Sequence, residues 1–156
     1  MRHPESAVAP LEVTVPAGPA GPGPARYRLA ADLVAVHRPD RPVPAVRPVR
    51  EAARPPSGDA VLGPVYRRVP GGDLVVPTGR VLVRYSEGDR AERHRGELER
   101  TGYRMDRILG YAPHAAWVRA ADGGIAAALR RTAAIAALPG VRHVEPELLG
   151  ERQARG

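Results

Sequence analysis

The pattern of hydrophobic and polar residues is most regular after Asp73. From Gly79 to Tyr85 every second residue belongs to the same face of an extended chain. The two sets are Val81, Val83 and Tyr85 on one face and Arg80, Leu82 and Arg84 on the other. A period of two is typical of a strand with one buried face. The segment therefore predicts a strand that contributes its valines to a core.

Two helical patterns and three further strand patterns follow this strand. Arg90–Thr101 is strongly charged, with Asp89 in position to cap it and Gly102 in position to end it. Gly123–Leu138 carries apolar residues at three- and four-residue steps, which is typical of an amphipathic helix. The predicted strands are Tyr103–Leu109, Ala115–Ala120 and Val141–Val144.

The order of these elements is strand, helix, strand, strand, helix, strand, which is the ferredoxin-like split βαβ arrangement. It predicts an α+β open-faced sandwich over residues 73–150. Two helices would cover one face of a four-stranded antiparallel sheet. The opposite face of the sheet would stay open for a partner.

Proline divides the chain, because 15 of the 18 prolines lie in residues 1–77. Residues 1–25 are rich in proline and glycine, so we expect a disordered arm there. Residues 26–72 predict an irregular segment with linkers and one or two extra short strands, and residues 151–156 predict a flexible tail. The strand candidates in this first half are Arg26–His37 and Leu62–Val69.

Composition restricts the chemistry that the chain can perform. The formal charge is +7 and every basic residue is arginine, which suits nucleic acid. The arginines are scattered, however, which favours a bias in codon usage as their cause. The absence of cysteine excludes disulfides and thiolate metal sites. The five histidines lack ligand spacing, so we expect neither a metal site nor a cofactor.

The sequence shows no segment that would direct the chain to a membrane. No apolar run is long enough to span a bilayer, and the N-terminus lacks the sustained apolar stretch of a signal peptide. We therefore expect a cytoplasmic location by default, with the site of action left open. We also expect a monomer when the protein is free, and no membrane partner.

Three segments of the second half are familiar in their order. They are VPTGRVLVRYSEGD, LERTGYRMDRILGYAPHAAWVRA and AALPGVRHVEPELL, which together cover roughly Pro77 to Leu149. This series resembles the propeptide (inhibitor) domain of subtilisin-like serine proteases, most specifically in its ending LPGVRHVEPE. The resemblance implies an inhibitor or folding chaperone that docks its open sheet face on the protease. It also implies an extended C-terminal tail that lies in the substrate cleft, where it adds backbone hydrogen bonds.

The chain departs from that family because it stops about seven residues after the domain, where a catalytic domain normally follows. Its serines are Ser6, Ser57 and Ser86, and none lies in a G-x-S-x-G setting or belongs to a recognisable Ser-His-Asp set. We therefore expect that the chain is not an enzyme. It would be a stand-alone inhibitor or a separately encoded prodomain fragment of a larger protease.

The resemblance implies two groups of residues that contact the protease. The sheet-face group is Leu82, Arg84, Trp117, Arg119 and Val144. The tail group is Glu145, Glu147, Leu148, Leu149 and Gly150. Each group has a structural alternative: the tryptophan can belong to the core, the two glutamates can form a solvated strand end, and the two leucines can close the domain's own core.

RNA binding is the alternative function. A ferredoxin-like sheet that carries arginine and an aromatic ring on its open face is also similar in outline to an RNA-binding module. Such modules stack bases on several aromatic rings, whereas the segment AAWVRA supplies one. A regulatory domain that binds a small molecule is a third class, for which the sequence contains no ligand motif.

Overall fold

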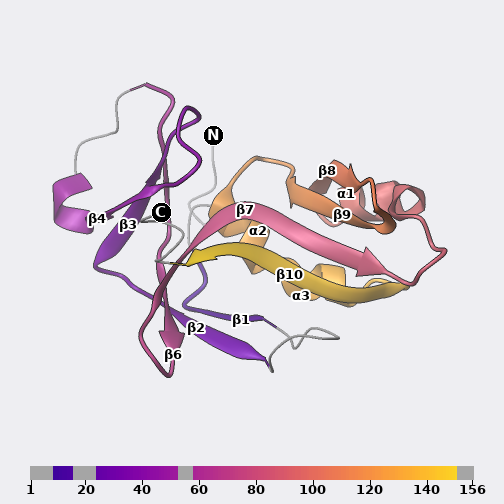
Figure 1. Ribbon diagram of the computed structural model, residues 1–156, viewed down its shortest axis with the longest axis horizontal. Helices are drawn as coiled ribbons and strands as arrows, with labels where there is room; N and C mark the ends of the chain where they lie inside the picture. Colours follow the sequence, from indigo (N-terminus) through magenta and orange to yellow (C-terminus); the bar gives the residue numbers. More distant parts are fainter. Residues whose placement is uncertain (1–8, 16–23, 53–57, 151–156) are drawn as a thin grey trace.

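The computed structural model describes residues 9–15, 24–52 and 58–150, which form a mixed α+β molecule built mostly from antiparallel strands (Figure 1). The strands of the first half are β1 Glu12–Val15, β2 Ala25–Leu29, β3 Leu33–His37, β4 Ala45–Pro48, β5 Val61–Gly63 and β6 Tyr66–Val69. The strands of the second half are β7 Leu74–Tyr85, β8 Tyr103–Leu109, β9 Ala112–Ala120 and β10 Val141–Gly150. The helical segments are η2 Val49–Ala52, η3 Ala91–His94, α1 Arg95–Arg100, α2 Ile125–Arg130 and α3 Thr132–Ala136.

Strand β7 organises the larger, seven-stranded sheet. Val75 pairs with Tyr66 of β6 and with Gly150 of β10, and Leu82 pairs with Trp117 of β9 and with Glu145 of β10. Because a strand has two edges, β10 lies along one edge of β7 while β6 and β9 share the other. Strand β8 pairs with β9, and β2 and β1 continue the sheet beyond β6. The sheet is therefore larger than the four strands that the sequence predicts.

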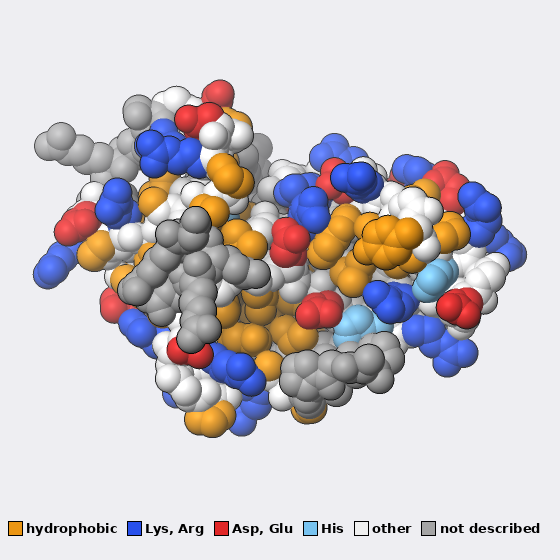
Figure 2. Space-filling model, in the orientation of Figure 1, with side chains coloured by type: hydrophobic (Ala, Val, Ile, Leu, Met, Phe, Trp, Pro, Cys, Tyr) orange, Lys and Arg blue, Asp and Glu red, His pale blue; other side chains and the backbone are white. Residues whose placement is uncertain are grey.

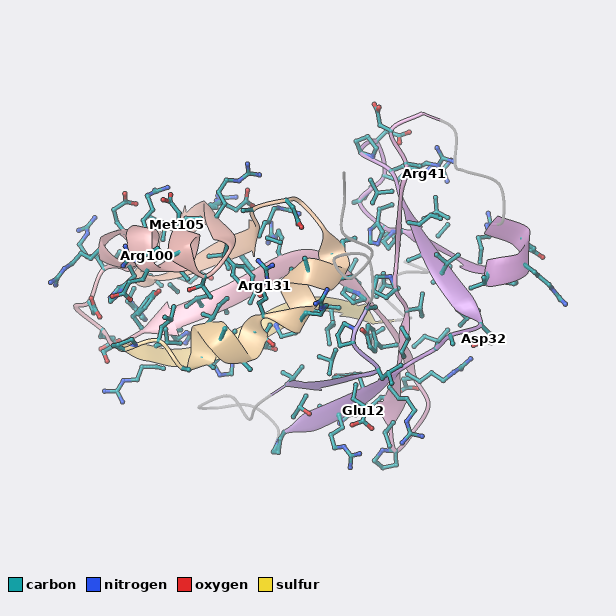
Figure 3. The ribbon with its side chains drawn as sticks, turned by 180° about the vertical axis from the view of Figure 1, so that it is seen from behind. Glu12, Asp32, Arg41, Arg100, Met105 and Arg131 are labelled. Carbon is teal, nitrogen blue, oxygen red and sulfur yellow. The ribbon has the colours of Figure 1, made fainter. Side chains whose placement is uncertain are left out.

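The helical segments of the second half cover one face of this sheet, as the view from behind shows (Figure 3). The alternation predicted for β7 is confirmed, because its core face is buried against α2 and η3. The main core combines aliphatic side chains with two buried tyrosines; its large buried members include Val81, Val83, Tyr85, Leu98, Tyr103, Val118 and Ile135. The strand predicted at Tyr103–Leu109 is confirmed with the same bounds.

Both predicted helices are shorter than their patterns suggested. The first consists of η3 followed by α1, so Arg90 and Thr101 lie just outside it. The second divides into α2 and α3 at Arg131, whose φ of −107° and ψ of 9° are not helical. Hydroxyl groups bond to the carbonyls that precede the break: Tyr103 donates to Ala128 and Thr132 donates to Leu129. These side-chain hydrogen bonds satisfy backbone acceptors near the break.

The first half contains more regular structure than expected. Residues 1–25 were predicted to be a disordered arm, but Glu12–Val15 form strand β1, which pairs with β2 and extends the large sheet. The hydroxyl of Tyr66 donates to the carbonyl of Pro10 at 2.7 Å and helps to hold this strand. The prediction is therefore wrong for β1, and residues 1–8 and 16–23 lie outside the described residues.

Residues 26–72 form several short strands rather than one or two. The candidate Arg26–His37 contains β2 and β3, which belong to different sheets: β2 joins the large sheet, and β3 lies between β4 and β5 in a separate three-stranded sheet. The candidate Leu62–Val69 contains the end of β5 and all of β6. The predicted tail at residues 151–156 lies outside the described residues.

Candidate functional site

The face of the sheet opposite the helices is the candidate site. In the view of Figures 1 and 2, hydrophobic, basic, acidic and histidine side chains gather over β7, β9 and β10. Direct cross-strand pairs share a face, so Leu82 lies beside Trp117 and Arg80 lies beside Arg119. Arg84, Leu82, Trp117 and Arg119 are all partly exposed. We call this surface the open face.

A network of four side chains is built around Trp117. The guanidinium carbon of Arg80 lies 4.3 Å from the centre of the indole ring, which is a cation–π contact. Arg80 also donates to Glu147 at 3.3 Å, and the hydroxyl of Thr78 donates to the same carboxylate at 2.8 Å. Because both side chains of the ion pair are only 28% exposed, the network holds the ring in one place on the surface.

The other charged residues of the open face differ in their pairing. Arg119 lies 3.3 Å from Asp106, and His143 lies 3.1 Å from Glu145. Arg84 has its Nε buried without an acceptor in the described part of the chain. The open face therefore combines an ordered aromatic ring, several internal ion pairs and the partly buried guanidinium group of Arg84, which has no acceptor among the described residues.

Val144 was predicted to lie on the open face, and this is wrong. It pairs with Val83, so it points toward the helices, and it is only 5% exposed within the main core. The register between Val141 and His143 contains an irregularity, after which the alternation of β10 places Val144 inside. The residues of β10 that share the open face are instead His143 and Glu145, which pair with Arg84 and Leu82.

The predicted tail is part of a strand. Strand β10 was expected to end at Val144, but it continues to Gly150 and pairs with β7 along its whole length. Leu148 pairs with Pro77 and packs on the apolar cluster that contains Val13 and Tyr66. Of the two alternatives for Leu148, the structure supports the one in which it closes the domain's own core. The backbone pairing also means that Leu149 and Gly150 are not an extended free tail.

Arg80 and Asp106 belong to the open face but were not among the predicted contact residues. Arg80 lies on the same alternating face as Leu82, so the period of two gave a signal for it. Its pairing with Glu147 depends on how β10 aligns with β7 across 67 residues of chain, and no local pattern encodes that alignment. Asp106 was predicted only as a strand residue, although it supplies the carboxylate for Arg119.

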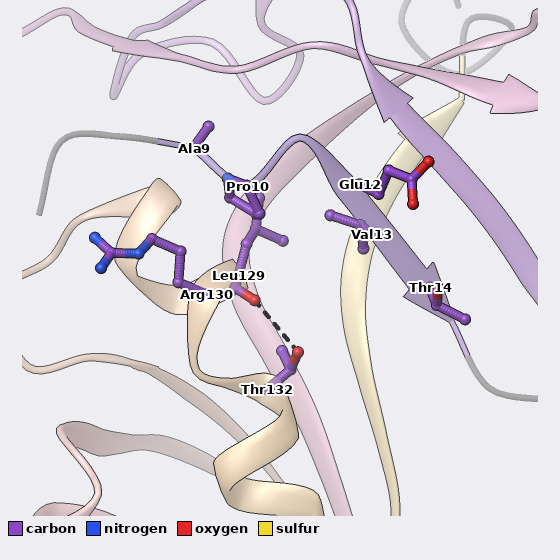
Figure 4. Close-up of a pocket in the computed structure, with 8 residues that line it drawn as sticks. All are labelled: Ala9, Pro10, Glu12, Val13, Thr14, Leu129, Arg130 and Thr132. Carbon is purple, nitrogen blue, oxygen red and sulfur yellow. Dashed lines mark hydrogen bonds between the residues drawn. The ribbon is translucent and has the colours of Figure 1, made fainter. Parts of the chain in front are cut away.

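A pocket of about 520 Å³ lies between β1 and the α2–α3 helices (Figure 4). Its walls combine apolar side chains such as Val13 and Leu129 with Glu12, Arg130 and two threonines. The hydroxyl of Thr132 is turned to the carbonyl of Leu129. Among the described residues, the pocket lining contains no histidine, serine or cysteine.

A second polar cluster lies at the end of β7, away from the open face. The ring of His94 stacks on Tyr85 with 4.0 Å between centroids, and Nε2 of His94 lies 2.9 Å from Asp89. Burial raises the pKa of Tyr85 to about 12, with Glu97 and Asp89 adding to the effect. No cluster of three or more residues suited to bind a metal ion occurs in the described part of the chain.

In comparisons with known proteins, no family model, no curated protein and no solved structure matches this chain. Within residues 9–15, 24–52 and 58–150, no helix is long and apolar enough to cross a membrane.

Proposed function

We propose that this chain is a propeptide-like inhibitor and folding chaperone of a subtilisin-like serine protease, and that it docks on the enzyme by its open face. The observation that carries the proposal is the strand order β10–β7–β9–β8, in which every pair is antiparallel. Helical segments occur in both crossovers, between β7 and β8 and between β9 and β10. This arrangement supports a ferredoxin-like split βαβ unit inside the larger sheet.

The open face has the composition of a docking surface. An aromatic ring and a leucine lie at its centre, and charged side chains surround them. Interfaces between proteins have this anatomy, with an apolar core and a polar rim. Trp117 is the natural anchor, because the Arg80 contact fixes its ring before binding and little conformational entropy remains to be lost. The segments that resemble the subtilisin propeptides include the strands that carry these residues.

The pairing of β10 limits which residues of the predicted tail could act as an inhibitory segment. The backbone of β10 is paired with β7 as far as Gly150, so residues 145–150 are occupied within the sheet. We propose that residues 151–156 enter the substrate cleft. An extended segment placed there would compete with substrate by adding backbone hydrogen bonds to the enzyme.

The same docking accounts for a chaperone role. A ligand that binds the folded protease and not its unfolded chain stabilises the folded state by mass action. Docking by the open face would meet this condition, because a rigid sheet can match only a formed surface. Inhibition and assistance in folding would thus come from one set of contacts.

The experiment is an inhibition assay of the full chain against several subtilisin-type enzymes, with a chymotrypsin-type enzyme as the specificity control. Trp117→Ala should weaken both inhibition and binding about tenfold or more, as expected for a central aromatic anchor. Tyr111→Ala is the matched control, because Tyr111 is 88% exposed in the turn between β8 and β9. That variant should bind like the parent chain.

Deletion of residues 151–156 separates the two parts of the interface. The deletion leaves β10 intact, so binding measured by calorimetry should survive while inhibition weakens. If the intact chain slows none of the subtilisin-type enzymes and binds single-stranded RNA in a salt-dependent manner, the proposal fails and RNA binding replaces it.

A further inference from the structure

Arg84 is the most unusual charged residue of the open face. Its side chain is partly buried, and its Nε is shielded from solvent without an acceptor. Its cross-strand neighbours are Ala115 on β9 and His143 on β10. Neither neighbour supplies a carboxylate, and Arg84 forms no ion pair among the residues that the structure describes.

Two nearby arginines have a carboxylate partner. The Nε of Arg80 is also buried without an acceptor among the described residues, but its Nη2 donates to Glu147, and Arg119 has Asp106 as its partner. A guanidinium group loses solvation when it is partly buried, and it recovers that free energy when a carboxylate accepts its hydrogen bonds. Arg80 and Arg119 have such a partner among the described residues, whereas Arg84 has none there. A carboxylate of a bound partner would supply the acceptor that Arg84 lacks among them.

The charge of the open face favours an acidic partner. The three carboxylates nearest its centre each have a basic neighbour: Glu147 has Arg80, Asp106 has Arg119, and Glu145 has His143. Arg104 and Arg107 also share this face, because they pair with Arg119 and Trp117. They are exposed and have no ion pair within the described residues, so the charge that remains uncompensated here is positive.

An apolar contact is available beside Arg84. Leu82 is two residues before it on the same face of β7, and Leu82 pairs directly with Trp117. Residues two apart on a strand are neighbours on one side of a sheet. A partner that presents a carboxylate next to an apolar side chain would therefore fill both positions at once.

We propose that the open face binds a protein segment that places a carboxylate on Arg84 and an adjacent apolar side chain on Leu82 and Trp117. The inference rests on the proposed function and deepens it, because it states the chemistry required of the protease surface: an aspartate or glutamate beside an aliphatic or aromatic side chain. Arginine favours this partner because its planar fork matches a carboxylate in two hydrogen bonds.

The test uses the full chain and the fluorescence of Trp117, which is its single tryptophan. The probe is a synthetic decapeptide of alternating leucine and glutamate, and its control has glutamine in place of glutamate. Arg84→Gln should weaken binding of the acidic peptide about tenfold. Arg93→Gln is the matched variant, because it removes the same charge from an exposed position in η3, and it should bind like the parent chain.

Folding of the variants is checked by thermal unfolding, and Arg84→Gln should melt at least as high as the parent because it removes a partly buried cation. If it does not fold, Arg84→Lys serves instead, and it should also bind more weakly because an ammonium group lacks the planar fork. Equal affinities for Arg84→Gln and Arg93→Gln, or equal binding of both peptides, would overturn the inference. If a ten-nucleotide oligouridine binds more tightly than the acidic peptide, and this binding depends on Arg84, the site is assigned to phosphates instead.

Protease inhibition is measured with the same variants, so that the two proposals can fail separately. If binding of the acidic peptide depends on Arg84 but the parent chain inhibits no subtilisin-type enzyme, the carboxylate site stands and the proposed function fails. If the parent chain inhibits and Arg84→Gln inhibits equally well, the proposed function stands and the carboxylate site is wrong.

Discussion

Two glycines that are close in sequence provide a test of the backbone around the first helix. Gly96 is the second residue of α1, and its φ is not positive. Gly102 follows the helix and has a φ of 93°. The same substitution by alanine should therefore have opposite effects on the free energy of unfolding, because only Gly102 needs a conformation that L-residues avoid.

The magnitudes follow from the surroundings of each glycine. A Cβ on Gly96 would meet only Nη1 of Arg100 at 3.6 Å, an ordinary contact, so Gly96→Ala should stabilise the protein by about 0.5–1 kcal/mol. A Cβ on Gly102 would lie 2.0 Å from Nη1 of Arg131, which must move. The positive φ adds about 1–2 kcal/mol, so Gly102→Ala should destabilise by at least that amount.

The assay is urea unfolding of the full chain, followed by circular dichroism and by the fluorescence of Trp117. Thermal melting should move by about 2–4 °C for each kcal/mol in a chain of this size, upward for Gly96→Ala and downward for Gly102→Ala. Gly102→Asn is a useful third variant, because asparagine tolerates the left-handed region better than alanine. A shift of the two alanine variants in the same direction would refute the reasoning from backbone conformation.

The remaining predictions concern buried tyrosines. Tyr103→Phe removes the hydrogen bond to the carbonyl of Ala128 and should lower the free energy of unfolding by about 1 kcal/mol in urea titrations, whereas Tyr111→Phe at the exposed turn should leave it unchanged. Burial raises the pKa of Tyr66, Tyr85 and Tyr103 above the ordinary value of 10.0, to about 12 for Tyr85. Because the folded state holds these protons more tightly, their contribution to stability is complete below pH 10 and is lost as the pH rises through the raised pKa values, about 12 for Tyr85. Absorbance at alkaline pH should show these tyrosines ionising together with unfolding, and ionisation well before unfolding would contradict their burial.

Local pattern was sufficient for several elements of the second half. The alternation in Gly79–Tyr85 identified the core face of β7, and Tyr103–Leu109 is a strand with the predicted bounds. The placement of Trp117 beside Leu82 also agrees with alternation along β9. These predictions succeed because the side chains of a strand alternate whatever its partners are. The period of an element is a property of its own residues.

Pairing between distant strands decided where β10 ends and whether β1 forms. Strand β10 continues to Gly150 because β7 begins at Leu74 and offers it a partner along its whole length. Strand β1 lies within the segment expected to be an arm, and it is held by β2 and by Tyr66. A short segment forms a strand when another strand satisfies its backbone groups, and nothing within four residues of β1 reveals that partner.

The open face depends both on the local pattern of residues and on the pairing between distant strands. Its arginines and its tryptophan follow from the two-residue period of β7 and β9, which the sequence determined. The register of β10 on β7 decides the pairing of Arg80 with Glu147 and the burial of Val144. It also leaves Arg84 beside His143, without an acceptor among the described residues. A shift of one residue in that register would turn every side chain of β10 to the other face, so only the tertiary structure could decide which charges on this surface are paired.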